Sequence, residues 1–170
     1  MKFSIKYLAM AVAMFVLGQG AMAGPMQVEL EPIRHARAQL VVAGPNGEAT
    51  YAPADLEALG ASRMVTVTPW RDDETEFDGV LLTEILEANG LGDAEAIRVI
   101  AENDYAVVIE AETWKRWPIL VATRVNGKPH TRRERGPIQF VLPMSDDPSS
   151  GAKGHGKNWV WMAARIEVAE

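Results

Sequence analysis

Three arginines in the last third of the chain are the residues with the clearest chemical use. Arg132, Arg133 and Arg135 stand close together, and Gly136 follows them directly. Guanidinium groups bind carboxylates and phosphates through paired hydrogen bonds. A glycine lets the backbone approach a ligand closely, so its amide can add a further donor. The spacing therefore indicates an anion-binding site.

Three further residues are expected to complete this site. Trp70 precedes a charged stretch, while His155 and Lys157 belong to a polar, glycine-rich segment, 145–157. Loops carried by a rigid scaffold are common places for binding residues. We therefore expect a ligand- or cofactor-binding site, without catalytic residues or metal ligands, made of Trp70, Arg132, Arg133, Arg135, Gly136, His155 and Lys157. In the alternative interpretation these residues belong to the solvated connections of a core strand.

The element that must position the arginines is the run 135–143. Its Gly136-Pro137 pair forces a sharp entry, a mostly apolar stretch follows, and Pro143 removes a backbone donor. This pattern predicts a buried strand with a marked start and stop.

Trp159 and Trp161 are predicted to lie on the final strand. Residues two apart on a strand point to the same face of the sheet. That face is either the core, where the indoles would pack against Ile138, Phe140 and Leu142, or the wall of a cleft. The core is the favoured interpretation.

The rest of the pattern alternates short strands with short helices. Period-two alternation and β-branched residues favour strands, while proline, threonine and glycine positions delimit the helices. Strands are predicted at 38–43, 63–68, 96–101, 105–109 and 119–125, and the chain is expected to return to the core at 79–82. Helices are predicted at 54–59, 83–88 and 110–117. A charged loop is predicted at 71–78 and an N-terminal arm at 24–37.

Residues 1–23 have the three parts of a secretory signal peptide: two lysines, an apolar run and a small-residue cleavage site. The apolar run is short for a bilayer span. We expect export by the general secretory route, cleavage before Gly24 and a periplasmic or secreted location. The domain is expected to occupy 38–170.

The balance of charge and the absence of cysteine exclude several kinds of function. Loss of the two signal lysines changes the formal charge from −6 to −8, and such a surface repels nucleic acid and anionic lipid. With no cysteine, the chain has no disulfide, no thiol catalysis, no iron–sulfur cluster and no thiolate-bound metal. The histidines, His35, His130 and His155, lack the spacing of a metal site.

A set of features in a fixed order identifies a resemblance. These are Asp55-Leu56-Glu57-Ala58-Leu59, Thr66-Val67-Thr68-Pro69-Trp70, Phe77-Asp78-Gly79-Val80-Leu81-Leu82 with Ile85-Leu86, Asn103-Asp104-Tyr105, Asn126-Gly127-Lys128-Pro129, Arg135-Gly136-Pro137-Ile138 through Pro143, and 159–168. Together they resemble the sulfite-oxidase-type molybdopterin-binding domain, and more closely its small exported stand-alone members. The resemblance covers about 38–168, although no single motif is diagnostic.

The resemblance implies an α+β fold of mixed, mostly β sheets with short peripheral helices. For the large oxidoreductases it also implies a pterin cofactor whose molybdenum is bound by a cysteine in the loop after the second strand. This chain has Thr68-Pro69-Trp70 there, and no oxygen or nitrogen ligand reproduces a thiolate's electron donation. The lysine–tryptophan pair of those enzymes is also unmatched, because Asn158 and Val160 precede the two tryptophans.

The signal peptide departs from that pattern as well. The resemblance implies folded export behind a twin-arginine signal, whereas this signal has single lysines. A chain exported unfolded would meet its cofactor outside the cytoplasm.

These departures lead to two functional hypotheses. In the first, the chain is an exported, non-catalytic binding or accessory protein without a resident cofactor, which binds a small anion or a partner such as the periplasmic domain of a membrane sensor. In the second, it is a molybdopterin-dependent oxidoreductase or a subunit of one, with the arginines and the backbone near Gly136 holding the pterin phosphate. Molybdenum analysis separates the two classes.

Overall fold

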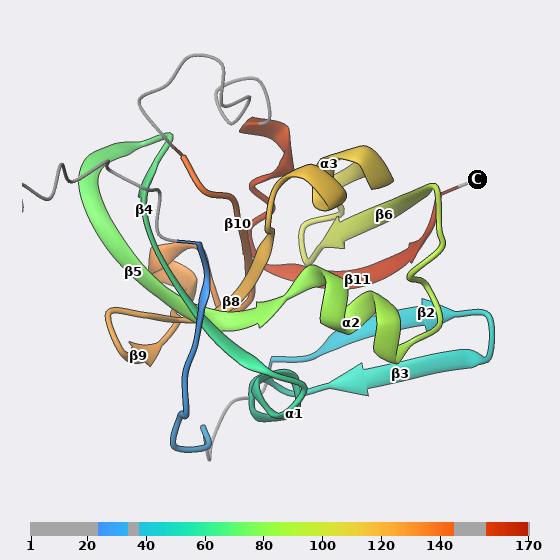
Figure 1. Cartoon of the computed structure of the whole chain (residues 1–170), viewed down its shortest axis with the longest axis horizontal. Coiled ribbons are helices and arrows are strands. Elements are labelled where there is room, and N and C mark those ends of the chain that lie inside the picture. The colour runs from blue at the N-terminus through green and yellow to red at the C-terminus, as the bar shows by residue number, and fades with distance from the viewer. Residues whose placement is uncertain (1–23, 34–37, 145–155, 170) are drawn as a thin grey trace, which may run out of the picture.

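The computed structural model describes residues 24–33, 38–144 and 156–169, and it shows an α+β domain built from two sheets with short helices around them (Figure 1). The expected α+β class is therefore confirmed. The first sheet has the strand order β1-β4-β5-β8-β10, with β9 paired to β8. The second sheet has the order β3-β2-β11-β6-β7. Between described strands, β2 and β11 pair in parallel and the other pairs are antiparallel.

The elements have the following bounds. The strands of the first sheet are β1 (Met26–Gln27), β4 (Ala61–Thr68), β5 (Arg71–Leu81), β8 (Leu120–Val125), β9 (Lys128–Pro129) and β10 (Gln139–Val141). Those of the second are β2 (Leu40–Gly44), β3 (Gly47–Tyr51), β6 (Ala96–Ala101), β7 (Ala106–Glu110) and β11 (Ala163–Val168). The helices are α1 (Pro53–Ala58), α2 (Leu82–Ala88), α3 (Ala111–Arg116) and the 3₁₀ turn η1 (Arg132–Glu134).

A continuous apolar core includes side chains from both sheets and from α1, α2 and α3. Strand β6 alternates between buried and half-buried residues, as its period-two pattern predicts. Strands β8 and β10 are buried along most or all of their length, which explains their continuous apolar sequences. Among the described residues, no helix is both long and apolar enough to cross a membrane.

The prediction of a charged loop at 71–78 is wrong, because these residues belong to strand β5. Thr75 and Phe77 are buried. The carboxylates of Glu76 and Asp78, which follow them, are paired with an arginine on the neighbouring strand β4. Arg63 on β4 donates through Nε to Asp78 Oδ1 at 2.7 Å, and its Nη1 lies 3.1 Å from Glu76 Oε2. A dense run of carboxylates therefore forms a strand, because the neighbouring strand supplies the cation.

The predicted strand at 135–143 is also shorter than expected, since β10 spans Gln139–Val141. Arg135 has a φ of 79°, which an extended strand does not adopt. The side chains of Ile138, Phe140 and Leu142 are nevertheless fully buried, as the apolar pattern requires.

The N-terminal arm lies against the edge of the first sheet. β1 pairs with β4, and Val28 N donates to Ala61 O at 2.9 Å. Arg124 on β8 donates through Nη2 to the carbonyl oxygen of Glu31 and forms a two-point ion pair with Glu57 on α1. This buried ion pair therefore ties the arm, α1 and the first sheet together.

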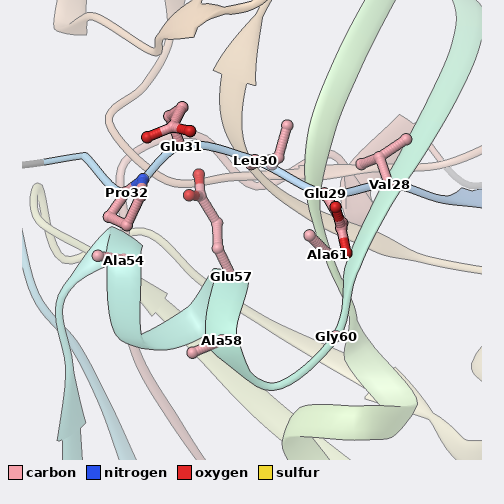
Figure 2. Close-up of a pocket in the computed structure, with 10 residues that line it drawn as sticks. All are labelled: Val28, Glu29, Leu30, Glu31, Pro32, Ala54, Glu57, Ala58, Gly60 and Ala61. Atoms are coloured by element: carbon pink, nitrogen blue, oxygen red, sulfur yellow. The ribbon is translucent and has the colours of Figure 1, made fainter.

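A hollow of about 680 Å³ separates the arm from α1, and the Glu57 carboxylate points from the helix toward the arm (Figure 2). Glu29 and Glu31 add two further carboxylates to its wall. Since Glu57 is already bound to Arg124, this hollow offers a ligand few unsatisfied groups.

Candidate functional site

Two distant segments come together beside β10 to form the candidate site. Phe140 N donates to Val160 O at 2.8 Å, and Ala163 N donates to Ile138 O at 2.9 Å. These hydrogen bonds place the arginine segment alongside the segment that carries Trp159 and Trp161. The turn between β4 and β5 adds Trp70 to the same place.

Trp70, Arg135, Trp159 and Trp161 make up what we call the tryptophan–arginine cluster. The Arg135 guanidinium carbon lies 4.6 Å from the ring centroid of Trp70 and 4.7 Å from that of Trp161. Trp70 meets the other two indoles edge to face, with ring centroids 5.6 Å from Trp159 and 4.7 Å from Trp161. Both the cation–ring and the edge-to-face geometries are attractive, so the cluster is a preorganised unit.

A hollow of about 310 Å³ opens beside this cluster. Its walls are mostly aromatic, and they are formed by Trp70, Asn103, Tyr105, Gly156, Trp159, Trp161 and Met162. The Tyr105 hydroxyl donates to the carbonyl oxygen of Lys157 at 3.4 Å, which links the β6–β7 connection to the tryptophan segment. Segments from the β4–β5 turn, the β6–β7 connection and the segment before β11 therefore share one small cavity.

The backbone around the hollow is strained. In the described part of the chain, Asp104, Asn126, Arg135 and Met162 are the residues other than glycine with positive φ. Met162 lines the hollow, Asp104 lies between the lining residues Asn103 and Tyr105, and Arg135 contacts the lining residues Trp70 and Trp161, while Asn126 belongs to the turn between β8 and β9. Met162 N donates to Arg135 O at 3.2 Å, so two of the strained residues are bonded to each other. Such conformations cost about 1–3 kcal/mol each and gather at functional sites.

The Arg135 guanidinium has no hydrogen-bond acceptor and no carboxylate partner among the residues that the structure describes. By contrast, Arg63, Arg124 and Arg165 each form ion pairs with carboxylates. Stacking on two indoles stabilises a cation without using its N–H donors. The donors of Arg135 are therefore available to an anion.

Two indole N–H groups of the cluster are also unsatisfied. The Nε1 atoms of Trp159 and Trp161 are buried, and no acceptor for either lies within the described residues. A buried donor without an acceptor costs about 1–3 kcal/mol. The cluster thus combines several features that reduce stability, which is common at binding sites.

The predicted site residues have different surroundings in the structure. Trp70 and Arg135 are in direct contact, and the backbone of Lys157 accepts a hydrogen bond from Tyr105 at the hollow. Arg132 instead forms an ion pair with Glu102. Arg133 is exposed, with no ion pair in the described ranges.

Gly136 does not line the cavity. A Cβ at Gly136 would lie 2.6 Å from Cγ of His130, so this glycine is required by packing. His155 lies outside the described residues.

The prediction that Trp159 and Trp161 lie on a strand is wrong. Met162, with a φ of 51°, interrupts the extended backbone, and β11 begins at Ala163. Trp159 is 4 % exposed and belongs to the core, while Trp161 is half-buried, and both line the hollow. Core and cleft are therefore not alternatives here, because the hollow is set into the edge of the core.

Asn103, Tyr105 and Met162 were not identified from the sequence as site residues. The Asn103-Asp104 pair is readable as a turn, and Tyr105 as the start of a strand. Nothing in that local pattern indicates contact with a segment more than fifty residues away, whereas the hydrogen bond from Tyr105 to Lys157 spans 52 positions.

His130, which packs against Gly136, gives a testable pH dependence. Its Nε2 donates to Gln139 Oε1 at 2.8 Å, and burial lowers the pKa of the imidazole. Between this lowered pKa and the ordinary value of about 6.5, the unfolded chain binds a proton that the folded chain does not. The stability associated with His130 is therefore complete above that window and is lost progressively as the pH falls through it.

We expect the His130→Gln variant to have a flatter dependence of unfolding free energy on pH than the parent as the pH falls below about 7. Glutamine retains a donor for Gln139 but does not titrate. Urea unfolding of both proteins across this range measures the difference. Parallel profiles would show that His130 is not neutral and buried in the folded protein.

The residues present do not fit a sulfite-oxidase-type molybdenum centre. The chain has no thiolate, and the loop after β4 carries Trp70, whose ring is stacked on Arg135. Within the described ranges, no group of three histidine or acidic side chains is arranged to hold a metal ion. The chain therefore lacks the ligand that anchors the metal in centres of that type.

A scan against protein-family models finds no match for the chain, and a search of curated proteins finds no similar sequence.

Proposed function

We propose that the protein is an exported, non-catalytic binding protein that holds a small anion at the tryptophan–arginine cluster. The observation that carries this proposal is Arg135, a half-buried cation without a carboxylate partner among the described residues, which lies against the rings of both Trp70 and Trp161. Acidic residues outnumber basic ones in this chain, 23 to 17. A cation that remains unpaired in such a chain favours a ligand that supplies the negative charge.

The energetics support binding by a small molecule. A hydrogen bond between a charged donor and an acceptor contributes about 1.5–3 kcal/mol. The indoles hold the guanidinium in place before the ligand arrives, which reduces the entropy lost on binding. The volume of about 310 Å³ is at the lower end of the range for ligand pockets, about 300–1,000 Å³.

The fold assigned to this function is that of the sulfite-oxidase-type molybdopterin-binding domain. Its support is the order of the motifs between residues 38 and 168 together with the mixed α+β architecture. In place of the family's metal-binding cysteine, the loop after β4 supplies Trp70 to the cluster. We propose that the scaffold is kept and the redox centre is replaced by a binding site.

Location and partner follow from the same proposal. Residues 1–23 have the pattern of a general secretory signal, so the site would face the periplasm or the medium. A binding protein without catalysis acts through a protein that responds to its bound state. The periplasmic domain of a membrane sensor is the partner that we propose.

Thermal unfolding in the presence of a panel of small anions tests the proposal. An anion at 100 times its Kd stabilises the folded protein by about 2.7 kcal/mol, which corresponds to about 5–11 °C in Tm for a chain of this size. We expect at least one anion to raise the Tm of the parent and of an Arg133→Gln control, but not of Arg135→Gln. Equal shifts in the parent and Arg135→Gln, or no shift with any anion, would contradict it.

A further inference from the structure

The walls of the hollow restrict the shape of the ligand. Trp70, Tyr105, Trp159 and Trp161 contribute aromatic rings, and Met162 contributes a polarizable thioether. Aromatic pairs gain about 0.5–1.5 kcal/mol beyond the burial of their area, and sulfur adds favourable contacts at ring edges. A flat, unsaturated body gains most from such walls.

The size of the hollow limits that body further. A volume of about 310 Å³, at the lower end of the range for ligand sites, accommodates one or two fused rings but not a dinucleotide. Asn103 contributes a polar side chain to the wall, but its Oδ1 already accepts a hydrogen bond from Tyr105 N at 3.3 Å. The enclosed part of the ligand therefore needs few polar groups.

The charges of the cluster favour a ligand with a single negative charge. Arg135 is the unpaired guanidinium within the described cluster, whereas Arg132 is bound to Glu102. Asp104, beside Asn103, is exposed and brings negative charge to the same connection. A dianionic phosphate would meet one available guanidinium in a chain with a formal charge of −6, and like charges nearby reduce its binding. A carboxylate matches one guanidinium in both charge and planar geometry.

We infer that the ligand is a monocarboxylate carried on a flat aromatic or heteroaromatic ring, with the ring in the hollow and the carboxylate held by Arg135. This inference rests on the proposed function and narrows it to one chemical class. The ring supplies the contacts with the indoles and Tyr105. The carboxylate supplies the counter-charge that Arg135 lacks among the described residues.

Calorimetric titration with three matched probes tests the inference. The probes are 2-naphthoate, its neutral analogue 2-naphthamide, and the dianion 2-naphthyl phosphate, and they share the same ring. We expect 2-naphthoate to bind about ten-fold or more tightly than 2-naphthamide, because a charge-assisted hydrogen bond is worth about 1.5–3 kcal/mol. It should also bind more tightly than 2-naphthyl phosphate, whose second negative charge is unfavourable in an acidic chain.

Two variants separate the roles of charge and ring. Arg135→Gln is expected to remove the preference for 2-naphthoate over 2-naphthamide. Tyr105→Ala, at a position where the side chain is exposed, is expected to weaken both probes by about 2–10-fold. Val108→Ala is the control, since Val108 is also exposed, in the middle of β7, but does not line the hollow.

The outcomes distinguish this inference from the proposed function. Equal binding of acid and amide, tighter binding of the phosphate ester, or no effect of Tyr105→Ala would overturn the inference. If 2-naphthoate fails while another anion raises the Tm in an Arg135-dependent way, the ligand class is wrong and the proposed function stands. If no anion acts through Arg135, both are wrong.

Discussion

Replacing Glu57 with alanine is expected to lower the free energy of unfolding by about 3–5 kcal/mol. The Glu57 carboxylate accepts hydrogen bonds from Arg124 Nε at 2.8 Å, Arg124 Nη2 at 2.7 Å and Thr123 Oγ1 at 2.6 Å. The two charged side chains are only 6 % and 10 % exposed. Without the carboxylate, the buried guanidinium would keep the Glu31 carbonyl as its acceptor within the described residues, which is far weaker compensation than an opposite charge.

Urea unfolding of the parent and the variant measures this loss. Glu87→Ala is a suitable control, because Glu87 is an exposed glutamate on α2 and its removal should change stability by no more than about 0.5 kcal/mol. The double variant Glu57→Met, Arg124→Met should regain much of the loss, because apolar side chains can replace a buried ion pair. A Glu57→Ala variant as stable as the control would show that the ion pair is solvated in solution.

Replacing Trp159 with alanine is expected to cost a similar amount, about 3–5 kcal/mol. The indole is 4 % exposed, packs edge to face with Trp70 and belongs to the apolar core. Trp161→Ala should cost less stability because Trp161 is half-buried. Trp161→Ala should weaken anion binding more than Trp159→Ala does, because the Trp161 ring contacts the Arg135 guanidinium.

Thermal unfolding and anion titration of both variants separate these effects. Trp117→Ala is the matched control, a half-buried tryptophan at the end of α3 that stacks with Arg116 instead. A Trp159→Ala protein with the stability of the parent but without anion binding would mean that Trp159 serves the ligand and not the fold.

Much of the fold is predictable from local sequence patterns. The predicted strand at 96–101 coincides with β6, and the predicted helix at 83–88 differs from α2 by one residue. In both places the periodic pattern and the turn residues favour the same structure. Strand β5 was missed because its acidic residues are compatible with a strand only when Arg63 lies opposite them, and local patterns carry no information about that pairing.

The candidate site is predictable only in part, for a related reason. Trp70 and Arg135 stand out as residue types suited to binding. Their contact depends on backbone turns at Arg135 and Met162, two residue types with no preference for positive φ. Tyr105 reaches the hollow through the pairing of β6 with β7 and β11, which is a property of the assembled sheet.

The most direct test of the central claim, that the tryptophan–arginine cluster binds an anion in place of a resident molybdenum cofactor, is non-denaturing mass spectrometry of the protein isolated from its native cells. We predict a population carrying a small organic ligand that is absent from Arg135→Gln, and no mass that corresponds to a molybdenum–pterin complex. A molybdenum–pterin mass on most chains, retained in Arg135→Gln, would contradict the claim and identify the protein as an oxidoreductase or a subunit of one.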